Sequence, residues 1–356
     1  MPESLVYVGT YTVRGSQGIY AYSFDSDSGN LRLLGLAAET TNPTFLAVDR
    51  PRSLVYAVEE TSEYKNQPSG ALRAYTADLG TGGLTLLNEV ASKGTGPCYI
   101  AFDKTGRYLL TANYHGGSIA IFPRLEDGRL GQASAFVQHK GGRPFTVRQQ
   151  VPHAHAICTS PDNKLVVVAD LGLDKVLLYR FDETTGSLAD GEATYGIVEE
   201  GAGPRHLAFH PNGRFVYVLN ELASTVTQFA FDAATASLQT VRTVSGLPEG
   251  FGDHSDAAHL QLEALGRFLY ISNRGHDSIA VFAIDTLDGT LKVIQHISTQ
   301  GKTPRGFVLD PSGQWLLAGN QDTDSVAVFR ISRETGELAF TRLIPGVPSP
   351  AFLIFP

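Results

Sequence analysis

Hydrophobic residues in this chain occur in short runs, separated by turns rich in Gly, Pro, Asp and Asn, as is typical of short β-strands. One phrase recurs: a Pro-led apolar run, a turn of the Asp/Pro-x-Gly-Arg type, a second apolar run ending in Asn or Asp, and a third run. Residues 204–221, PRHLAFHPNGRFVYVLNE, show its first two runs. Copies start at residues 43, 97, 152, 204, 257 and 304, so they are 54, 55, 52, 53 and 47 residues apart.

Each copy has room for four antiparallel strands. The third run, as in DSVAVFRIS, is followed by a turn and then by a GSL, GTL or GEL that opens a fourth. Several runs are apolar on both faces, which is expected of a sheet that is covered on both sides. In a β-propeller each blade packs between two others, so this pattern indicates a propeller.

The two ends of the chain complete one more unit. The N-terminal segment supplies SLVYVGTYT, GIYAYSFD and GNLRLLGLA, which match second, third and fourth strands, and the C-terminal PSPAFLIFP matches a lone first strand. Joining them closes the ring and leaves no exposed sheet edge. The alternative, tandem β-sandwiches, needs interdomain linkers, and none is evident.

We therefore predict an all-β, seven-bladed propeller with four antiparallel strands per blade, closed by pairing of the N-terminal strands with the C-terminal strand. It forms a single domain, residues 1–356. The blades are expected near residues 43–96, 97–151, 152–203, 204–256, 257–303 and 304–347, with the last made of 348–356 and 1–42.

Composition narrows the possible partners and location. The formal charge is −8 and no Lys/Arg run occurs, which argues against nucleic acid and against an anionic lipid surface. Two cysteines make neither a disulfide framework nor a Cys-rich metal site. The N-terminus lacks the basic and apolar regions of a signal peptide, and no apolar stretch is long enough to span a membrane. We expect a cytoplasmic protein. The sequence does not determine the oligomeric state, and a monomer is the favoured interpretation.

In a propeller the first strand of each blade lines the central channel, so we expect the functional residues around that channel. Polar residues occur at the starts of several first strands and at the ends of several second strands. A repeat position with a purely structural role would instead carry an apolar residue, Gly or Pro. The first-strand starts supply Thr44, Cys98, Tyr99, His153, His155, Arg205, His206, His259 and Arg305, and the second-strand ends supply Tyr11, Glu59, Glu60, Asn113, Tyr114, Asp170, Asn220, Glu221, Asn273, Arg274, Asn320 and Gln321. The alternative is a polar, water-filled channel without a ligand.

His153 and His155 are two residues apart, so on a strand both would point to the same side. They could be half of a metal site, but a general base or a hydrogen-bonding pair is the favoured interpretation, and we predict neither a metal nor a cofactor. The recurring Asn residues at the second-strand ends are interpreted as structural. No G-x-S-x-G, P-loop, EF-hand or H-E-x-x-H motif occurs.

Arginines near the channel mouth point to an anionic small molecule. Arg205 and Arg274 carry planar forks suited to carboxylate or phosphate, and Arg148 and Arg305 add to them. Alternatively each arginine pairs with a structural carboxylate such as Glu221. Glu221 itself could orient a histidine, act as a base, or hold Arg205.

Together the phrases PHAH (152–155), GPRH (203–206), LNEL (219–222) and SNRGHDS (272–278) resemble the lactonase family of seven-bladed propellers, and the resemblance covers essentially the whole chain. It implies a lactone in the channel and a site made of His153 or His155, Arg205, Glu221 and Arg274. Two positions depart from the family pattern. His259 stands where an acidic residue is usual, and Gln150 stands where Glu is frequent.

The resemblance implies a hydrolase of a sugar lactone, first of all 6-phosphogluconolactone, which yields 6-phosphogluconate in the pentose phosphate pathway. His155, with His153 as second candidate, would activate water, or Glu221 would serve as the base. Arg205 and Arg274 would stabilise the oxyanion or hold the substrate's phosphate. Substrate-binding roles are expected for Arg148, His206, His259 and Arg305.

Two alternatives to this hydrolase remain. The first is another enzyme on the same site, acting on a different sugar lactone or cycloisomerising a muconate. The second is a non-catalytic binding propeller, although the G-H…W-D signature of WD40 scaffolds is absent.

Overall fold

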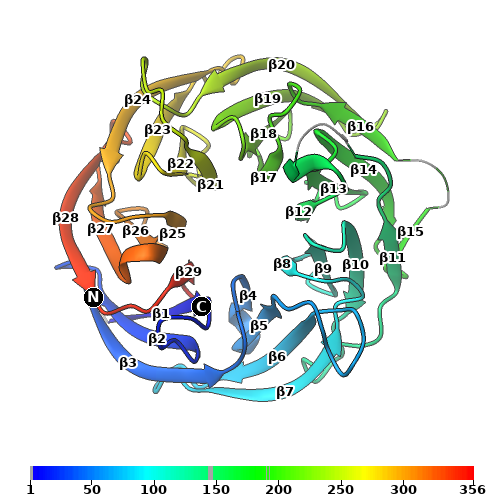
Figure 1. Cartoon of the computed structure of the whole chain (residues 1–356), viewed down its shortest axis with the longest axis horizontal. Coiled ribbons are helices and arrows are strands. Elements are labelled where there is room, and N and C mark those ends of the chain that lie inside the picture. Colours follow the sequence, from blue (N-terminus) through cyan, green and yellow to red (C-terminus); the bar gives the residue numbers. More distant parts are fainter. Residues whose placement is uncertain (1–2, 143–146, 190, 192) are drawn as a thin grey trace.

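The computed structural model describes residues 3–142, 147–189, 191 and 193–356. Its β-strands form seven sheets arranged as blades around a central axis (Figure 1). Six sheets have four strands each, and in the remaining one the outermost strand is divided into two short pieces that both pair with the third strand. The predicted all-β, seven-bladed propeller is confirmed.

The strands of each blade are given from the axis outward. The closing blade contains β29 (Pro350–Ile354), β1 (Ser4–Thr10), β2 (Gly18–Asp25) and β3 (Asn30–Glu39). The next blade contains β4 (Leu46–Asp49), β5 (Leu54–Glu59), β6 (Ala71–Ala77) and β7 (Leu84–Ala91). It is followed by the blade of β8 (Pro97–Phe102), β9 (Tyr108–Asn113), β10 (Ser118–Pro123) and β11 (Ala135–Gln138). The blade after that contains β12 (Ala154–Thr159), β13 (Leu165–Asp170), β14 (Lys175–Asp182) and the two short outer strands β15 (Ser187–Leu188) and β16 (Thr194–Ile197).

The fifth blade in this order contains β17 (Pro204–Phe209), β18 (Phe215–Asn220), β19 (Thr225–Asp232) and β20 (Ser237–Ser245). The sixth contains β21 (Asp256–Leu262), β22 (Phe268–Arg274), β23 (Ser278–Ile284) and β24 (Leu291–Ser298). The seventh contains β25 (Pro304–Leu309), β26 (Trp315–Asn320), β27 (Ser325–Ile331) and β28 (Leu338–Pro345). The described residues also form the short 3-10 turns η1 (Arg50–Arg52), η2 (Val147–Gln149) and η3 (Gln321–Thr323).

The ring closes where the two ends of the chain meet in one sheet. β29 pairs antiparallel with β1, with Val8 opposite Leu353 and Tyr7 opposite Ile354. β1 pairs on its other side with β2. A C-terminal strand therefore supplies the innermost strand of the blade that the N-terminus builds, as predicted from the end segments.

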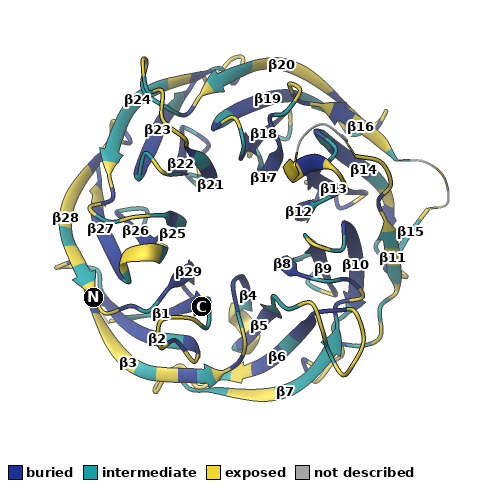
Figure 2. Ribbon diagram, viewed as in Figure 1, coloured by how far each residue is buried: buried dark blue, intermediate teal, exposed yellow. Residues whose placement is uncertain are grey.

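Burial explains why so many strands are apolar on both faces. All residues of β9, β13, β18 and β26 are buried, because each second strand packs against neighbouring blades on both sides. The outermost strands β20 and β28 carry many exposed residues (Figure 2). The core is therefore a set of apolar layers between blades, such as the one in which Val6 and Val8 pack with Leu317, Val326 and Leu353.

A β-bulge near the start of the first strand recurs in six consecutive blades of the described structure. The register against the second strand shifts by an extra residue in each of them, at Cys98, His155, Arg205, Ala258–His259, Arg305 and Ala351. A bulge bends the strand and redirects the side chains beside it. Consecutive residues such as Arg205 and His206 are in this way both buried at the axis.

The recurring asparagines fix the ends of the second strands. The side-chain amides of Asn113, Asn273 and Asn320 donate hydrogen bonds to the backbone oxygens of Ser92, Gly246 and Thr299, at distances of 3.1, 2.9 and 2.9 Å. Each acceptor lies just beyond the outermost strand of the preceding blade. The structural interpretation of these asparagines is confirmed, and the residue after each one is held at the channel mouth.

Among the described residues, no helix has both the length and the apolar character needed to cross a bilayer.

Closure of the ring predicts a position-specific loss of stability. Leu353 is completely buried between β1 and the neighbouring blade, so Leu353→Ala is expected to lower the free energy of unfolding by about 2–5 kcal/mol. The control Leu287→Ala removes a leucine that is 80% exposed and is expected to change it by less than about 0.5 kcal/mol. Urea unfolding followed by tyrosine and tryptophan fluorescence measures both. Equal midpoints for the two variants would show that the closing strand does not hold the ring.

Candidate active site

The Glu221 carboxylate lies at the centre of a charged cluster at the channel mouth. Its Oε1 is 2.6 Å from Arg148 Nη2 and 3.1 Å from Arg274 Nη2, and its Oε2 is 2.7 Å from Arg205 Nε and 3.6 Å from His155 Nε2. Only 2% of the Glu221 side chain is exposed. Both carboxylate oxygens therefore face positive or polar groups of the protein.

The charges of this cluster stabilise one another. Burial by itself would raise the pKa of Glu221, but Arg274, Arg205, His155 and Arg148 together hold that pKa well below its usual range. Burial lowers the pKa of Arg205 to about 10, although Glu221 opposes the shift. Glu221 is thus an anion and Arg205 a cation at neutral pH, and a carboxylate with so low a pKa is a poor proton acceptor.

The three arginines come from different parts of the ring and differ in exposure. Arg205 stands at the bulge of β17 and is 3% exposed. Arg274 ends β22, is 16% exposed, and donates hydrogen bonds to the backbone oxygens of Asp256 and Ala257. Arg148 lies in η2 and is 41% exposed. Arg274 and Arg148 are therefore the guanidiniums of the cluster that a ligand can reach from solvent.

Arg148 links the cluster to two further side chains. Its Nη2 donates a 3.1 Å hydrogen bond to the Tyr114 hydroxyl, and its Nη1 lies 3.4 Å from Asp256 Oδ2. Sequence reasoning placed Tyr114 at the mouth without a role and did not consider Asp256. The recurring second-strand end is the signal that located Tyr114, whereas nothing in the repeat marks Asp256, which begins β21.

The two candidate histidines have different surroundings. β12 begins at Ala154, so His153 precedes the strand, and His155 stands at its bulge. Alternation along a strand therefore does not apply to this pair. His155 is 5% exposed, with Nδ1 3.6 Å from Cys98 Sγ and Nε2 facing Glu221. Burial, followed by the charge of Arg205, lowers the pKa of His155 well below its usual range, so this ring is neutral.

His153 is half-buried and stacks on Tyr114, with ring centroids 4.4 Å apart. Its Nδ1 lies 2.9 Å from the Tyr114 backbone oxygen. A carbonyl oxygen only accepts hydrogen bonds, so Nδ1 carries the proton and Nε2 presents its lone pair in the neutral ring. His153 thus has the tautomer that a general base requires.

His206 and His259 lie beneath Arg205 rather than in the open mouth. Arg205 Nη1 is 3.1 Å from His206 Nε2, and His206 Nδ1 is 3.1 Å from His259 Nδ1. Because the guanidinium only donates, His206 accepts from Arg205 and donates to His259. Burial lowers the pKa of both histidines, that of His259 to about 3. Their predicted contact with substrate stays a prediction, and in this structure they support Arg205.

Arg305 belongs to a second polar group on another side of the mouth. Its Nη2 donates a 2.6 Å hydrogen bond to the Tyr11 hydroxyl, and its guanidinium lies over the Tyr11 ring. The Tyr11 hydroxyl is 3.2 Å from both oxygens of Glu60, which also accepts a short hydrogen bond from Thr44 Oγ1. Sequence reasoning had placed Arg305 with the other arginines. The structure instead places it beside Tyr11.

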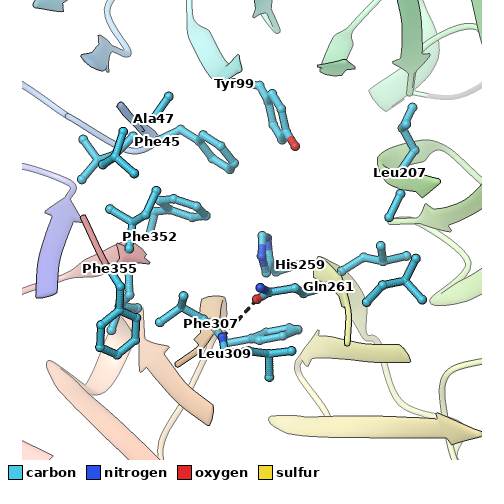
Figure 3. A pocket seen from close by; sticks show the side chains of 18 of the residues that line it. Phe45, Ala47, Tyr99, Leu207, His259, Gln261, Phe307, Leu309, Phe352 and Phe355 are labelled. Atoms are coloured by element: carbon cyan, nitrogen blue, oxygen red, sulfur yellow. Dashed lines mark hydrogen bonds between the residues drawn. The ribbon is translucent and has the colours of Figure 1, made fainter. Parts of the chain in front are cut away.

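Two cavities lie along the axis and differ in chemistry. One, of about 10 Å³, is lined by residues of both polar groups, among them Thr44, Arg205 and Arg305, and has room for about one water molecule. The other, of about 560 Å³, opens toward the far ends of the first strands and has mainly apolar walls, including Phe45, Phe307 and Phe352 (Figure 3). The larger cavity lacks the charged cluster, so the chemistry is assigned to the polar mouth.

Glu221, Arg205, Arg274, Arg148 and His155 thus meet as one group, and the structure adds Tyr114 and Asp256 to it. Gln150, one of the two departures from the family pattern, is exposed beside η2. Among the described residues, no three or more His, Cys, Asp or Glu side chains are grouped as metal ligands would be.

Comparison with known proteins agrees with this architecture. A protein from Bacillus subtilis named 6-phosphogluconolactonase is 36% identical over 356 residues, covering 100% of this chain and 99% of its own. A 6-phosphogluconolactonase from Formosa agariphila is 32% identical over 312 residues, or 86% of this chain and 87% of its own. The structure of a periplasmic gluconolactonase from Pseudomonas aeruginosa superimposes with a TM-score of 0.91 at 32% identity, over 99% of each chain.

The family model described as "Lactonase, 7-bladed beta-propeller" matches residues 5–355. The chain therefore belongs to the lactonase family of seven-bladed β-propellers.

Proposed function

We propose that this protein hydrolyses a sugar lactone, with 6-phosphogluconolactone as the first candidate. The observation that carries the proposal is the Glu221-centred group of three guanidiniums at the polar mouth, two of which are open to solvent. Such forks suit a phosphate or a developing oxyanion. Relatives named 6-phosphogluconolactonase at 36% and 32% identity support the same substrate.

His153 is the proposed general base. Its Nε2 lone pair is set by the Nδ1 hydrogen bond to the Tyr114 carbonyl, and the ring is accessible to water. His155 is buried, and its two nitrogens face Cys98 and Glu221, so we assign it to positioning Glu221. The geometry therefore favours His153, the second candidate from the sequence, over His155.

In the proposed reaction a water oxygen adds to the lactone carbonyl carbon while one water proton passes to His153 Nε2. Arg274 and Arg148 stabilise the oxyanion or the substrate phosphate, and Arg205 holds Glu221 in place between them. The bond from the carbonyl carbon to the ring oxygen then breaks, and His153 returns the proton to that oxygen. The product is the open-chain hydroxy acid, which ionises in water.

A second reaction class is supported by the same arginines. Four guanidiniums, those of Arg148, Arg205, Arg274 and Arg305, also suit a dicarboxylate, as a muconate cycloisomerase requires. Parallel assays on 6-phosphogluconolactone, unphosphorylated sugar lactones and muconates distinguish the two reactions.

The cytoplasmic location stays a prediction.

The first test generates 6-phosphogluconolactone in place with glucose-6-phosphate dehydrogenase and compares lactone loss with its spontaneous decay. We expect clear acceleration by the protein. Arg274→Ala is expected to lower kcat/KM about ten- to hundredfold, the value of one or two charge-assisted hydrogen bonds. Arg242→Ala, which removes an exposed arginine of β20, is the control and should match the wild type. A protein that accelerates no lactone loss, or an Arg274→Ala variant with full activity, would contradict the proposal.

The assignment of the base predicts different kinetics for the two histidines. His153→Asn should lower kcat by about 10²–10⁴-fold with little change in KM, because a general base contributes on that scale. His155→Asn should lower kcat and also raise KM, because it shifts the position of Glu221 and therefore of the arginines that Glu221 holds. Steady-state kinetics with circular dichroism as a check on folding separates the two. Wild-type kcat in His153→Asn would exclude this residue as the base.

A further inference from the structure

Glu60 occupies the position in its blade that Glu221 occupies in another. Each follows the end of a second strand, β5 for Glu60 and β18 for Glu221. The backbone amide of each donates to the oxygen of a residue just before the first strand of the same blade, Asn42 for Glu60 and Gly203 for Glu221. The two residues therefore follow second strands at the same end of the ring, and their blades are not neighbours (Figure 1).

The charges of both carboxylates act on the same two residues, Cys98 and Arg305. Cys98, at the bulge of β8, has a pKa raised first by burial, then by the charge of Glu60 and, to a smaller extent, of Glu221. The pKa of Arg305 is lowered by burial and raised by Tyr11, Glu60 and Glu221, with a net upward shift. Cys98 and Arg305 both line the small cavity next to Arg205.

The partners of the two carboxylates differ in charge. Glu221 is surrounded by three guanidiniums, whereas the Glu60 carboxylate receives hydrogen bonds from the hydroxyls of Tyr11 and Thr44. Within the described part of the chain, no Lys or Arg nitrogen forms an ion pair with Glu60. Arg305 donates to the Tyr11 hydroxyl instead.

Glu60 consequently retains acceptor capacity. An ionised carboxylate has about four acceptor positions, and the Tyr11 and Thr44 hydroxyls bring one proton each. The side chain is half-buried, so solvent or a ligand reaches it from the mouth. Burial raises the pKa of Tyr11, which keeps its proton and continues to donate.

A carboxylate in this state binds hydroxyl groups and repels other carboxylates. Hydroxyl donors form charge-assisted hydrogen bonds with it, and a second anion nearby is unfavourable. We infer that Glu60, held in place by Tyr11 and Thr44, is a specificity-determining residue that accepts hydrogen bonds from the hydroxyl groups of the lactone. It thereby selects polyhydroxylated lactones over deoxygenated or carboxylated ones. The inference rests on the proposed lactonase function.

The test compares two six-membered lactones that differ in their hydroxyls: glucono-δ-lactone and δ-valerolactone. For Glu60→Gln we expect kcat/KM for glucono-δ-lactone to fall about ten- to hundredfold, mainly through KM, because hydrogen bonds to a charged acceptor are lost. The same variant should open δ-valerolactone at the wild-type rate. Glu63→Gln, which removes an exposed carboxylate three residues away, is the control and should change neither substrate.

Tyr11→Phe provides a second, milder variant that keeps the ring and removes only the hydroxyl. We expect a smaller rise in KM, again confined to glucono-δ-lactone. An equal fall for both lactones in Glu60→Gln, or no change for either, would overturn the role in specificity while the lactonase function stands. A wild-type protein that opens neither these lactones nor 6-phosphogluconolactone would overturn the proposed function and the inference together.

Discussion

The structure of the channel mouth depends on the ion pairs that the buried Glu221 carboxylate forms with three arginines. A carboxylate so removed from water is strongly unfavourable unless paired, and here three guanidiniums and an imidazole surround it. The pairing works in both directions, because Arg205, Arg274 and Arg148 come from separate segments and would repel one another without the anion between them. The Glu221 side chain thereby holds all three guanidinium groups in their orientation at the mouth.

The fold could be read from the sequence because each blade repeats the same order of apolar runs and turns. Comparing equivalent positions of that repeat also found Glu221, Arg205 and Arg274 before any contact was known. The β-bulges could not be found in this way, since an extra residue in a strand leaves no mark in the apolar pattern. They are the reason that Arg205 and His206 both reach the axis, and that alternation does not describe His153 and His155.

Contacts between segments that are far apart in the chain also could not be predicted from the sequence. Arg148 reaches Glu221, Tyr114 and Asp256 from a short turn between two blades, and only the folded ring brings these residues together. The same holds for Tyr11, whose partners Glu60 and Arg305 come from other blades. An aromatic layer lies deeper on the axis, with Phe45 stacked between Tyr99 and Phe352 at centroid distances of 4.1 and 3.9 Å. Phe45 and Phe352 line both the small polar cavity and the large apolar cavity, so this aromatic layer lies between the two.

The hydrogen bond between Arg305 and Tyr11 joins residues 294 positions apart in the chain. Tyr11 follows β1, and β1 has no inner neighbour until β29 has been synthesised. The blades between them can form earlier, but the ring stays open at one side until β29 is in place. The second polar group at the mouth, which joins Tyr11, Glu60 and Arg305, is therefore completed only when β29 closes the ring.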